Sequence, residues 1–426
     1  MAGIHIHPHD VLDEGVTQIK DLIGEMTDIN YIFPQMNTIF ERNPYPIGVL
    51  PHNPKHKFVQ GKGEMHVILP SYKGEAIDQK RNTGLTSDAD PLMILKNEMT
   101  DTDIQIIPWA NILNGDFTGT AIQDNLVVDD QGIAVEKWLC PNAPDVIDFW
   151  EKVFTDTYQR YGYTTYMIDR IRYPDWAGEK VDPRGLLTCF CPHCEKKMSA
   201  RNLNIDDIKE KLAEIRALLK DKQFNQVVDI LTQDQSLKDW HRFRQNSVTT
   251  FIANLTQRLK QVDNRFAFLL DLWPPAYSWI LGQDYSQLTR YSSSLKHFPY
   301  HKLGGGADVQ GMIDYFADDS NESENAFKAF NRLFGLYDDL SYSQFKKEGF
   351  PIRFVAEQNK LARKKSQPDT QIFSGIQMWN IESEKLVEAV KAADESEADE
   401  LIYYCYGWAD RELFHAIGQY RRGDNS

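Results

Sequence analysis

Two aspartates stand where apolar, β-rich runs end, and their positions suit acid–base chemistry. Asp169 follows the run 165–168, and Asp271 follows the run 266–270. If both runs are buried strands of one barrel, the two carboxyl groups emerge at the same rim, where barrel enzymes carry their chemistry. Cleavage of a glycosidic bond needs two carboxyl groups flanking that bond. Asp169 and Asp271 are therefore the candidate catalytic pair, and Asp308 is a third acid that could replace Asp271.

The neighbours of the two aspartates predict different pKa values. Asp169 is followed by Arg170 and Arg172, and nearby cations lower the pKa of a carboxyl group. Asp271 lies in the apolar segment 270–274, which raises the pKa and suits a general acid. We expect Arg172 to orient Asp169 or a substrate hydroxyl. The alternative for a strand-end aspartate is a helix cap or an ion pair with a neighbouring arginine.

A cluster of cysteines predicts a metal site. Cys189, Cys191 and Cys194 lie within six residues, and Cys140 stands upstream at the start of a predicted helix. Four thiolates complete a tetrahedral zinc shell with no open position, which is the pattern of a structural site. His193 is an alternative fourth ligand, and four thiols packed as small apolar groups are the alternative to a metal. We expect a structural Zn²⁺ that pins the surrounding loop.

Histidines close the first predicted strand. His5 and His7 are two residues apart, and alternate residues of a strand point the same way. The metal sites of amidohydrolase barrels begin with this pattern, so a metal-dependent barrel hydrolase or isomerase is the alternative function. Its further ligands would have to come from other strand ends, which offer His297, His301 and Asp410. That set is incomplete, and we expect His5 and His7 to bind substrate hydroxyls instead.

Aromatic residues recur at the same predicted strand ends. Sugar rings stack on aromatic faces, so these side chains, together with Arg170, are candidate substrate-binding residues; they are Trp109, Tyr173, Trp273, Trp379 and Trp408. The alternative is a rim of half-buried core aromatics. A carbohydrate-binding barrel without catalysis is a third functional hypothesis.

The elements that must position these residues alternate between short apolar strands and amphipathic helices. The predicted strands are 3–7, 29–33, 104–109, 164–168, 265–270, 294–298, 371–378 and 400–406. Strands separated by helical crossovers indicate a parallel sheet with helices outside. We predict one α/β domain over residues 1–426, a (β/α)8 TIM barrel, with a doubly wound sheet as the alternative. Two connections exceed ordinary lengths, and we predict insertions after strands two and four: a long loop at 42–85, and a zinc-binding loop plus helices at 175–247.

Part of this pattern resembles glycoside hydrolase family 42, the β-galactosidases. The resemblance rests on the segment 138–144, the strand ending in Asp169-Arg170, and the Cys-x-Cys-x2-Cys motif at 189–194. It implies a barrel, a carbohydrate substrate and a four-cysteine zinc site beside the active-site face. The string 169–174 also resembles the strand-four end of other, uncharacterised barrel glycosidases.

The chain departs from family 42 at the catalytic positions. That family carries an Asn-Glu pair at the end of strand four, where this chain has Ile168-Asp169. It also carries a nucleophilic glutamate at the end of strand seven, and the segment 377–380 has none. The roles of the catalytic residues therefore have to be argued from this chain.

Composition limits the partners. The formal net charge is −15, and such a field repels nucleic acid and anionic membranes. We expect a carbohydrate substrate, no nucleic-acid or membrane partner, and a cytoplasmic location, since neither a signal peptide nor an apolar run of membrane-spanning length is visible. Assembly into a homo-oligomer is compatible with the sequence.

Overall fold

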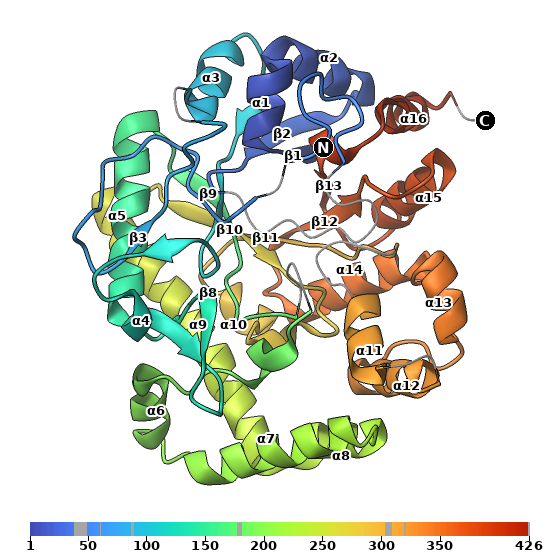
Figure 1. Cartoon of the computed structure of the whole chain (residues 1–426). Coiled ribbons are helices and arrows are strands. Elements are labelled where there is room, and N and C mark those ends of the chain that lie inside the picture. Colours follow the sequence, from blue (N-terminus) through green and yellow to red (C-terminus); the bar gives the residue numbers. More distant parts are fainter. Residues whose placement is uncertain are drawn as a thin grey trace.

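A ring of helices surrounds a central parallel sheet in the computed structural model of the chain (Figure 1). The structure describes residues 1–37, 49–59, 61–86, 89–176, 181–302, 309–318 and 321–424. The strands of the central sheet are β1 (Ala2–Ile6), β2 (Ile29–Pro34), β4 (Gln105–Ile106), β5 (Trp109–Asn111), β9 (Thr165–Asp169), β10 (Ala267–Leu272), β11 (Ser294–His297), β12 (Gln371–Gln377) and β13 (Glu400–Tyr404).

The sheet closes on itself. Its strand order is β4-β2-β1-β13-β12-β11-β10-β9-β5, and its neighbouring strands are parallel. The two outer strands, β4 and β5, are separated in the chain only by Ile107 and Pro108. One stretch of chain therefore pairs with β2 through β4 and with β9 through β5, which closes the barrel. The predicted α/β (β/α)8 barrel is confirmed.

The third strand differs from its prediction for a reason visible in the sequence. Residues 104–109 were expected to form one strand, but the strand is split into β4 and β5 around Pro108. Proline has no N–H to donate to a neighbouring strand. The fifth strand lies two residues later than predicted, because β10 runs from Ala267 to Leu272 and includes Asp271.

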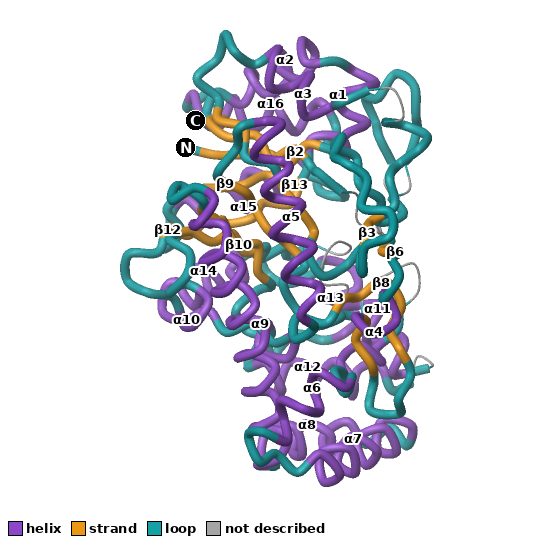
Figure 2. Tube along the Cα trace, turned by 90° about the vertical axis from the view of Figure 1, so that its left-hand side faces the viewer, coloured by secondary structure: helices purple, strands orange, loops and turns teal. Residues whose placement is uncertain are grey.

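Helices cover the outside of the barrel, as Figures 1 and 2 show. They are α1 (Pro8–Glu14), α2 (Val16–Met26), α3 (Pro91–Glu98), α4 (Ile122–Asn125), α5 (Pro144–Tyr161), α6 (Pro192–Ser199), α7 (Ile205–Lys220), α8 (Phe224–Gln233), α9 (Gln235–Val262), α10 (Tyr285–Leu288), α11 (Val309–Ala317), α12 (Ser323–Phe334), α13 (Tyr342–Glu348), α14 (Arg353–Lys365), α15 (Ser383–Asp394) and α16 (Arg411–Arg422). Local sequence sets their ends: α5 begins at Pro144 and stops at Gly162, whose φ of 80° suits glycine. No helix in the described ranges is long and apolar enough to cross a membrane.

The connections after β2 and β9 carry extra structure. Within the first, β3 (Asp78–Gln79) pairs antiparallel with β6 (Phe117–Thr118); residues 42–48 and 60 of the predicted insertion lie outside the described residues. The connection between β5 and β9 contains β6 and a hairpin of β7 (Leu126–Val128) and β8 (Ala134–Leu139). After β9 the chain forms α6, α7 and α8, and α7 and α8 project away from the barrel in both views (Figures 1 and 2). The assignment of residues 1–426 to one domain with two insertions stays a prediction.

The barrel interior is filled by apolar side chains in its middle. The inward residues of this cluster include Phe33, Trp109, Met167, Leu269, Phe373, Ile402 and Tyr404. Side chains alternate along a strand, so the residues two positions after Met167 and Leu269 also face inward. Those residues are Asp169 and Asp271.

Candidate active site

A row of polar side chains crosses the carboxyl end of the barrel. The register pairs Asn111 with Asp169 and Asp271 with Lys296. The pairing of β9 with β10 runs to Ile168 and Leu270, the residues just before the two aspartates, which places these aspartates level with each other. The four residues therefore lie beside one another on adjacent strands. The structure brings the predicted pair Asp169 and Asp271 to the same end of the barrel.

Asp169 is held by the arginines that follow it. Its Oδ1 accepts hydrogen bonds from the backbone N–H of Arg170 at 2.5 Å and from Nη1 of Arg172 at 2.9 Å. Both guanidinium groups also donate to Oδ2 of Asp175, at 2.8 and 2.9 Å. Burial raises the pKa of Asp169, but the charges of Arg172, Arg170 and Lys296 outweigh burial, so the pKa lies below its ordinary value. Asp169 is therefore an ionised carboxylate in a fixed orientation.

Asp271 has the opposite shift. Burial raises its pKa to about 7; Lys296 opposes the shift, and the charge of Asp169 adds to it. Nζ of Lys296 donates to Oδ2 of Asp271 at 2.9 Å and lies 3.4 Å from the hydroxyl of Tyr300. Oδ1 of Asp271 is buried with no hydrogen-bond partner among the described residues. Asp271 can therefore hold or release a proton near neutral pH, which is what a general acid and base must do. Both pKa directions agree with the sequence expectation.

Other buried polar atoms at this end of the barrel also lack partners among the described residues. They come from four strands or their ends, β1, β2, β5 and β12. These atoms are Nδ1 and Nε2 of His5, both amide atoms of Gln35, Nε1 of Trp109, Oδ1 of Asn111, Oε1 of Gln377 and Nε1 of Trp379. Buried polar atoms are nearly always hydrogen-bonded, so a group of orphans marks a place where a ligand or water binds. This set offers donors and acceptors to a molecule with many hydroxyl groups.

Three predicted aromatic residues lie around the same space. Trp379 contacts Tyr300 and Trp408 edge to face, at ring distances of 4.9 and 5.8 Å. Trp109 contacts His5 at 4.4 Å. The rings of Trp109, Trp379 and Trp408 are thus grouped with the polar row.

Two other predicted substrate-binding aromatics lie elsewhere. Tyr173 is fully buried beside the cysteine cluster, with the guanidinium of Arg244 4.6 Å from its ring centre. Trp273 is fully buried against Trp176, at a ring distance of 4.8 Å. Tyr173 therefore lies apart from the polar row, whereas the ring of Trp273 lies 5.4 Å from the guanidinium of Arg172, the arginine that holds Asp169. Asp308 lies outside the described residues.

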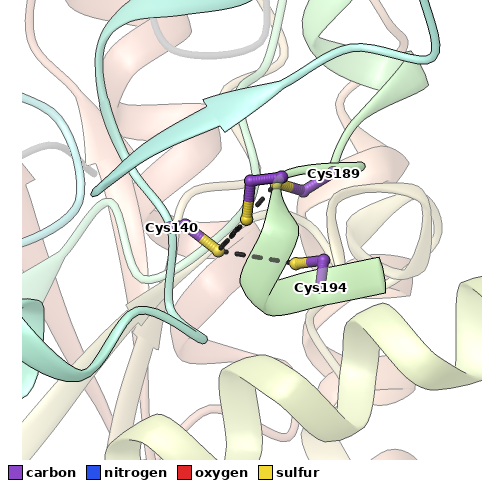
Figure 3. A group of neighbouring side chains, drawn as sticks. Cys140, Cys189 and Cys194 are labelled. Atoms are coloured by element: carbon purple, nitrogen blue, oxygen red, sulfur yellow. Dashed lines mark hydrogen bonds between the residues drawn. The ribbon is translucent and has the colours of Figure 1, made fainter. Parts of the chain in front are cut away.

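The four cysteines converge as predicted. Sγ of Cys140 lies 3.5 Å from Sγ of Cys191 and of Cys194, and 3.9 Å from Sγ of Cys189. All four are buried and none forms a disulfide. Figure 3 shows the sulfurs of Cys140, Cys189 and Cys194 turned toward one another. Nδ2 of Asn142 donates to Sγ of Cys194 at 3.2 Å.

The histidines group differently from the prediction. His7 forms a buried cluster with His9 and Asp10, whose ligand atoms all lie within 4.8 Å of one another. His5 instead lies deeper in the barrel, where burial and then the charges of Lys296 and His7 hold its pKa well below the ordinary value. His5 is therefore neutral and offers one donor and one acceptor.

Sequence reasoning missed Lys296, Gln35, Asn111 and Gln377. Lys296 carried a signal, since a lysine flanked by Leu295 and His297 inside a predicted strand indicates a buried charge with a partner. The amides carried none, because their inward orientation depends on the register of the closed barrel.

Comparison with known proteins identifies the fold. No family profile matches the chain, and no curated protein sequence matches it. Among solved structures, it is similar to the PgaB (BpsB) glycoside hydrolase domain from Bordetella bronchiseptica, with a TM-score of 0.53, 11% identity, and coverage of 99% of this chain and 96% of that one. It is also similar to the catalytic domain of β-amylase from Paenibacillus polymyxa, with a TM-score of 0.53, 8% identity, and coverage of 100% and 98%.

A third similar structure is the β-galactosidase from the psychrophilic Marinomonas ef1, with a TM-score of 0.52 and 9% identity. The match covers 99% of this chain and 59% of that protein. These neighbours are glycoside hydrolases with a TIM-barrel-like fold, and at such identities the likeness concerns the fold. The specific resemblance to family 42 stays a prediction.

Proposed function

We propose that this protein hydrolyses a glycosidic bond at the carboxyl end of its barrel. Asp169 acts as the nucleophile, and Asp271 as the general acid and then the general base. The observation that carries this assignment is the opposite pKa shift of two buried carboxyl groups whose charges influence each other. One is ionised and the other titrates at about pH 7, which is the division of roles in such enzymes.

The surroundings of the pair support a sugar as the substrate. The unpartnered polar atoms of His5, Gln35 and Asn111 can bond hydroxyl groups, and the aromatic rings of Trp109 and Trp379 suit the apolar face of a sugar ring. The net charge of −15 is compatible with a neutral substrate.

The charge coupling supplies a way to change the role of Asp271. While Asp169 is ionised, its charge helps to keep Asp271 protonated, so Asp271 can protonate the leaving group. When Asp169 bonds to the sugar, its negative charge disappears and the pKa of Asp271 falls. Asp271, now ionised, can take a proton from the water that breaks the bond between Asp169 and the sugar. Lys296 stabilises that ionised state through its bond to Oδ2.

We expect retention of configuration at the sugar. Asp169 and Asp271 lie level on neighbouring strands, and such strands are about 4.8 Å apart. Retaining glycosidases hold their carboxyl groups about 5 Å apart, while inverting ones need more room for water.

The test is hydrolysis of a panel of aryl glycosides, with the anomer of the first product followed by proton NMR. Asp169→Asn should lose at least about 10³-fold in kcat, and azide should restore turnover of Asp169→Gly by replacing the carboxylate. Asp101→Asn, at an exposed side chain, is the matched control. If wild type binds sugars without cleaving any substrate, the protein is a carbohydrate-binding barrel; if Asp169→Asn cleaves as well as wild type, the assignment fails.

The cysteine cluster supports a second proposal, a structural Zn²⁺. Tetrahedral zinc with Zn–S bonds of about 2.3 Å places neighbouring sulfurs about 3.8 Å apart, and the separations from Cys140 are 3.5 to 3.9 Å. Four thiolates fill the shell, so the ion would link the loop after β8 to the start of α6. We expect one zinc per chain by metal analysis, lost in Cys191→Ser and kept in Cys405→Ser, a buried cysteine outside the cluster.

One observation favours a second candidate function. Nε2 of His9 lies 3.3 Å from Oδ1 of Asp10, and Nδ1 of His7 lies 3.8 Å from Oδ2. These separations fit three ligands around one metal ion with bonds of about 2.1 Å, as a metal-dependent hydrolase would need. A second, easily chelated metal whose removal abolishes turnover, and whose binding is lost in His9→Gln, would favour this function.

A further inference from the structure

A large cavity lies between the projecting helices and the barrel. Its volume is about 680 Å³, within the range of about 300 to 1,000 Å³ that small-molecule sites occupy. Helices α7 and α8 supply one wall, and α11 and α12 supply another; α8 packs against both α7 and α12. Figure 1 shows these two helix pairs on neighbouring sides of the lower barrel.

The lining of the cavity is mainly apolar. Leu212 and Leu219 of α7, Val228 of α8, and Ala329 and Phe330 of α12 belong to it. A protein interior normally fills such space with side chains. Apolar walls around an open volume of this size suit an apolar ligand.

A buried histidine lines the same cavity, next to Trp240, whose Nε1 also lacks a partner among the described residues. His241 of α9 is only 6% exposed, and neither ring nitrogen has a hydrogen-bond partner among the described residues. Its ring contacts Trp240 at 4.9 Å and Trp279 at 5.0 Å. Burial, aided by the charge of Arg244, lowers its pKa to about 3. The imidazole is thus neutral, with one donor and one acceptor unused, and buried groups left unpaired in this way destabilise a fold unless a ligand or water bonds to them.

The cavity is separated from the proposed catalytic residues. Trp176 lines it and packs against Trp273 at a ring distance of 4.8 Å. The guanidinium of Arg172, which holds Asp169, lies over the ring of Trp273 at 5.4 Å. Two tryptophan rings therefore stand between the cavity and the arginine that orients Asp169.

We propose that this cavity is a second ligand site, which takes a neutral, largely apolar molecule whose single hydroxyl or carbonyl group bonds to His241. The apolar walls bind the body of the ligand, and the neutral imidazole selects its polar group. The cations in the lining are already bonded or exposed: Arg184 pairs with Asp182, Arg216 with Asp130, and Lys222 with the carbonyl of Phe316, while Lys220 is exposed to water. A charged ligand is therefore disfavoured, because its charge would lose water without gaining a free opposite charge beside His241. The proposal does not depend on the glycosidase assignment.

The test uses 2-naphthol as the probe, with naphthalene and 2-naphthoate for comparison. Quenching of tryptophan fluorescence reports binding, since Trp176 and Trp240 line the cavity. We expect one saturable site for 2-naphthol and at least tenfold weaker binding of 2-naphthoate. His241→Leu should reduce the preference for 2-naphthol over naphthalene by roughly 2- to 12-fold, the value of one hydrogen bond, and leave naphthalene binding in place.

Two cavity-filling variants locate the site. Ala329→Trp enters the cavity from α12 and Val228→Phe enters it from α8. Each should abolish binding of both neutral probes, and one result stands if the other variant fails to fold. Hydrolysis, where present, should continue in the folded variant. The proposal is overturned if wild type shows no saturable binding, if both neutral probes bind a folded filling variant as before, or if His241→Leu leaves the preference unchanged.

Discussion

Lys296 sets the charge balance of the proposed catalytic pair, because it bonds to Asp271 and also acts on Asp169. With the pKa of Asp271 at about 7, kcat/KM should fall above neutral pH as the general acid loses its proton. The ammonium group lowers the pKa of Asp271. Lys296→Met should therefore move the alkaline limb of the pH profile to higher pH. The measurement is kcat/KM against pH for both proteins.

A control separates this charge effect from damage to the barrel. Lys302→Met removes a lysine from the segment that follows β11. Lys302 pairs with the exposed Glu348, so this variant should leave the alkaline limb where it is. An unmoved limb in Lys296→Met, with measurable activity, would remove Asp271 from the role of general acid.

Arg172 positions Asp169 through its planar guanidinium group, whose several N–H donors lysine cannot replace. It donates to Asp169 through Nη1 and to Asp175 through Nε and Nη2, whereas lysine offers a single point charge. Arg172→Lys should lower kcat on the order of 10²-fold, since a small displacement of a reacting group has such an effect. It should also move the acidic limb of the profile to higher pH, because one cause of the lowered pKa of Asp169 is weakened.

The acidic limb is the informative readout for Arg172. A general loss of folding would lower kcat without moving it. Arg258→Lys, in an exposed ion pair with Asp148, is the matched control. If kcat falls in Arg172→Lys while the limb stays in place, Arg172 supports the fold rather than the ionisation of Asp169.

The proposed zinc affinity of the cysteine cluster depends on hydrogen bonds to the sulfurs as well as on the sulfurs themselves. Asn142 donates its backbone N–H to Cys140 at 3.4 Å and its side-chain amide to Cys194 at 3.2 Å. Partners of metal ligands change affinity by about 10- to 100-fold. Asn142→Ala should weaken zinc binding by that factor, measured by competition with a chelator. Asn202→Ala should have no effect, and equal affinities in the two variants would argue against zinc held by this shell.

The elements were predictable where the sequence has only one way to bury its apolar groups. Each strand of the barrel is a short apolar run followed by a helix, and the predicted runs 29–33 and 294–298 overlap β2 and β11 almost completely. Close cysteine spacing also predicted the cluster, since short spacers can only turn the thiols toward one another. The break at Pro108 was not predicted, although the missing N–H of proline explains it, and the pairing of the two halves with different strands was not predicted either.

The content of the site was less predictable than its position. Asp169 and Asp271 directly follow apolar runs and could be placed. Tyr173 and Trp273 lie five and three residues past those runs, and they pack beside the cysteine cluster and against Trp176. Where a residue beyond a strand points depends on tertiary contacts, such as the packing of Trp273 on Trp176. His9 and Asp10 lie in one cluster with His7 because α1 begins just after β1 and turns the chain back. Strand periodicity alone does not reveal that boundary.

The molecule as a whole brings together residues from both ends of the chain. β1 pairs with β13, and the ring of Tyr404 lies 5.0 Å from that of His5. Folding thus buries polar groups that the unfolded chain exposes to water, both in the barrel and outside it. Burial lowers the pKa of His297 on β11, of His66 in the connection after β2 and of His241 in α9 to about 3.

Each such histidine couples folding to pH. In the unfolded chain His297 takes up a proton near pH 6.5, while in the fold it stays neutral down to about pH 3. Between these values the unfolded state binds one more proton, so the free energy of unfolding falls as pH falls, by about 1.4 kcal/mol per pH unit for this one group. His297→Gln should therefore reduce the slope of unfolding free energy against pH by about that amount between pH 5 and 6. Urea unfolding at several pH values measures the slope, and His415→Gln, at a side chain that is 58% exposed, should retain the wild-type slope. An unchanged slope in His297→Gln would mean that His297 is protonated in the fold, and that β11 does not bury it as closely as the barrel geometry requires.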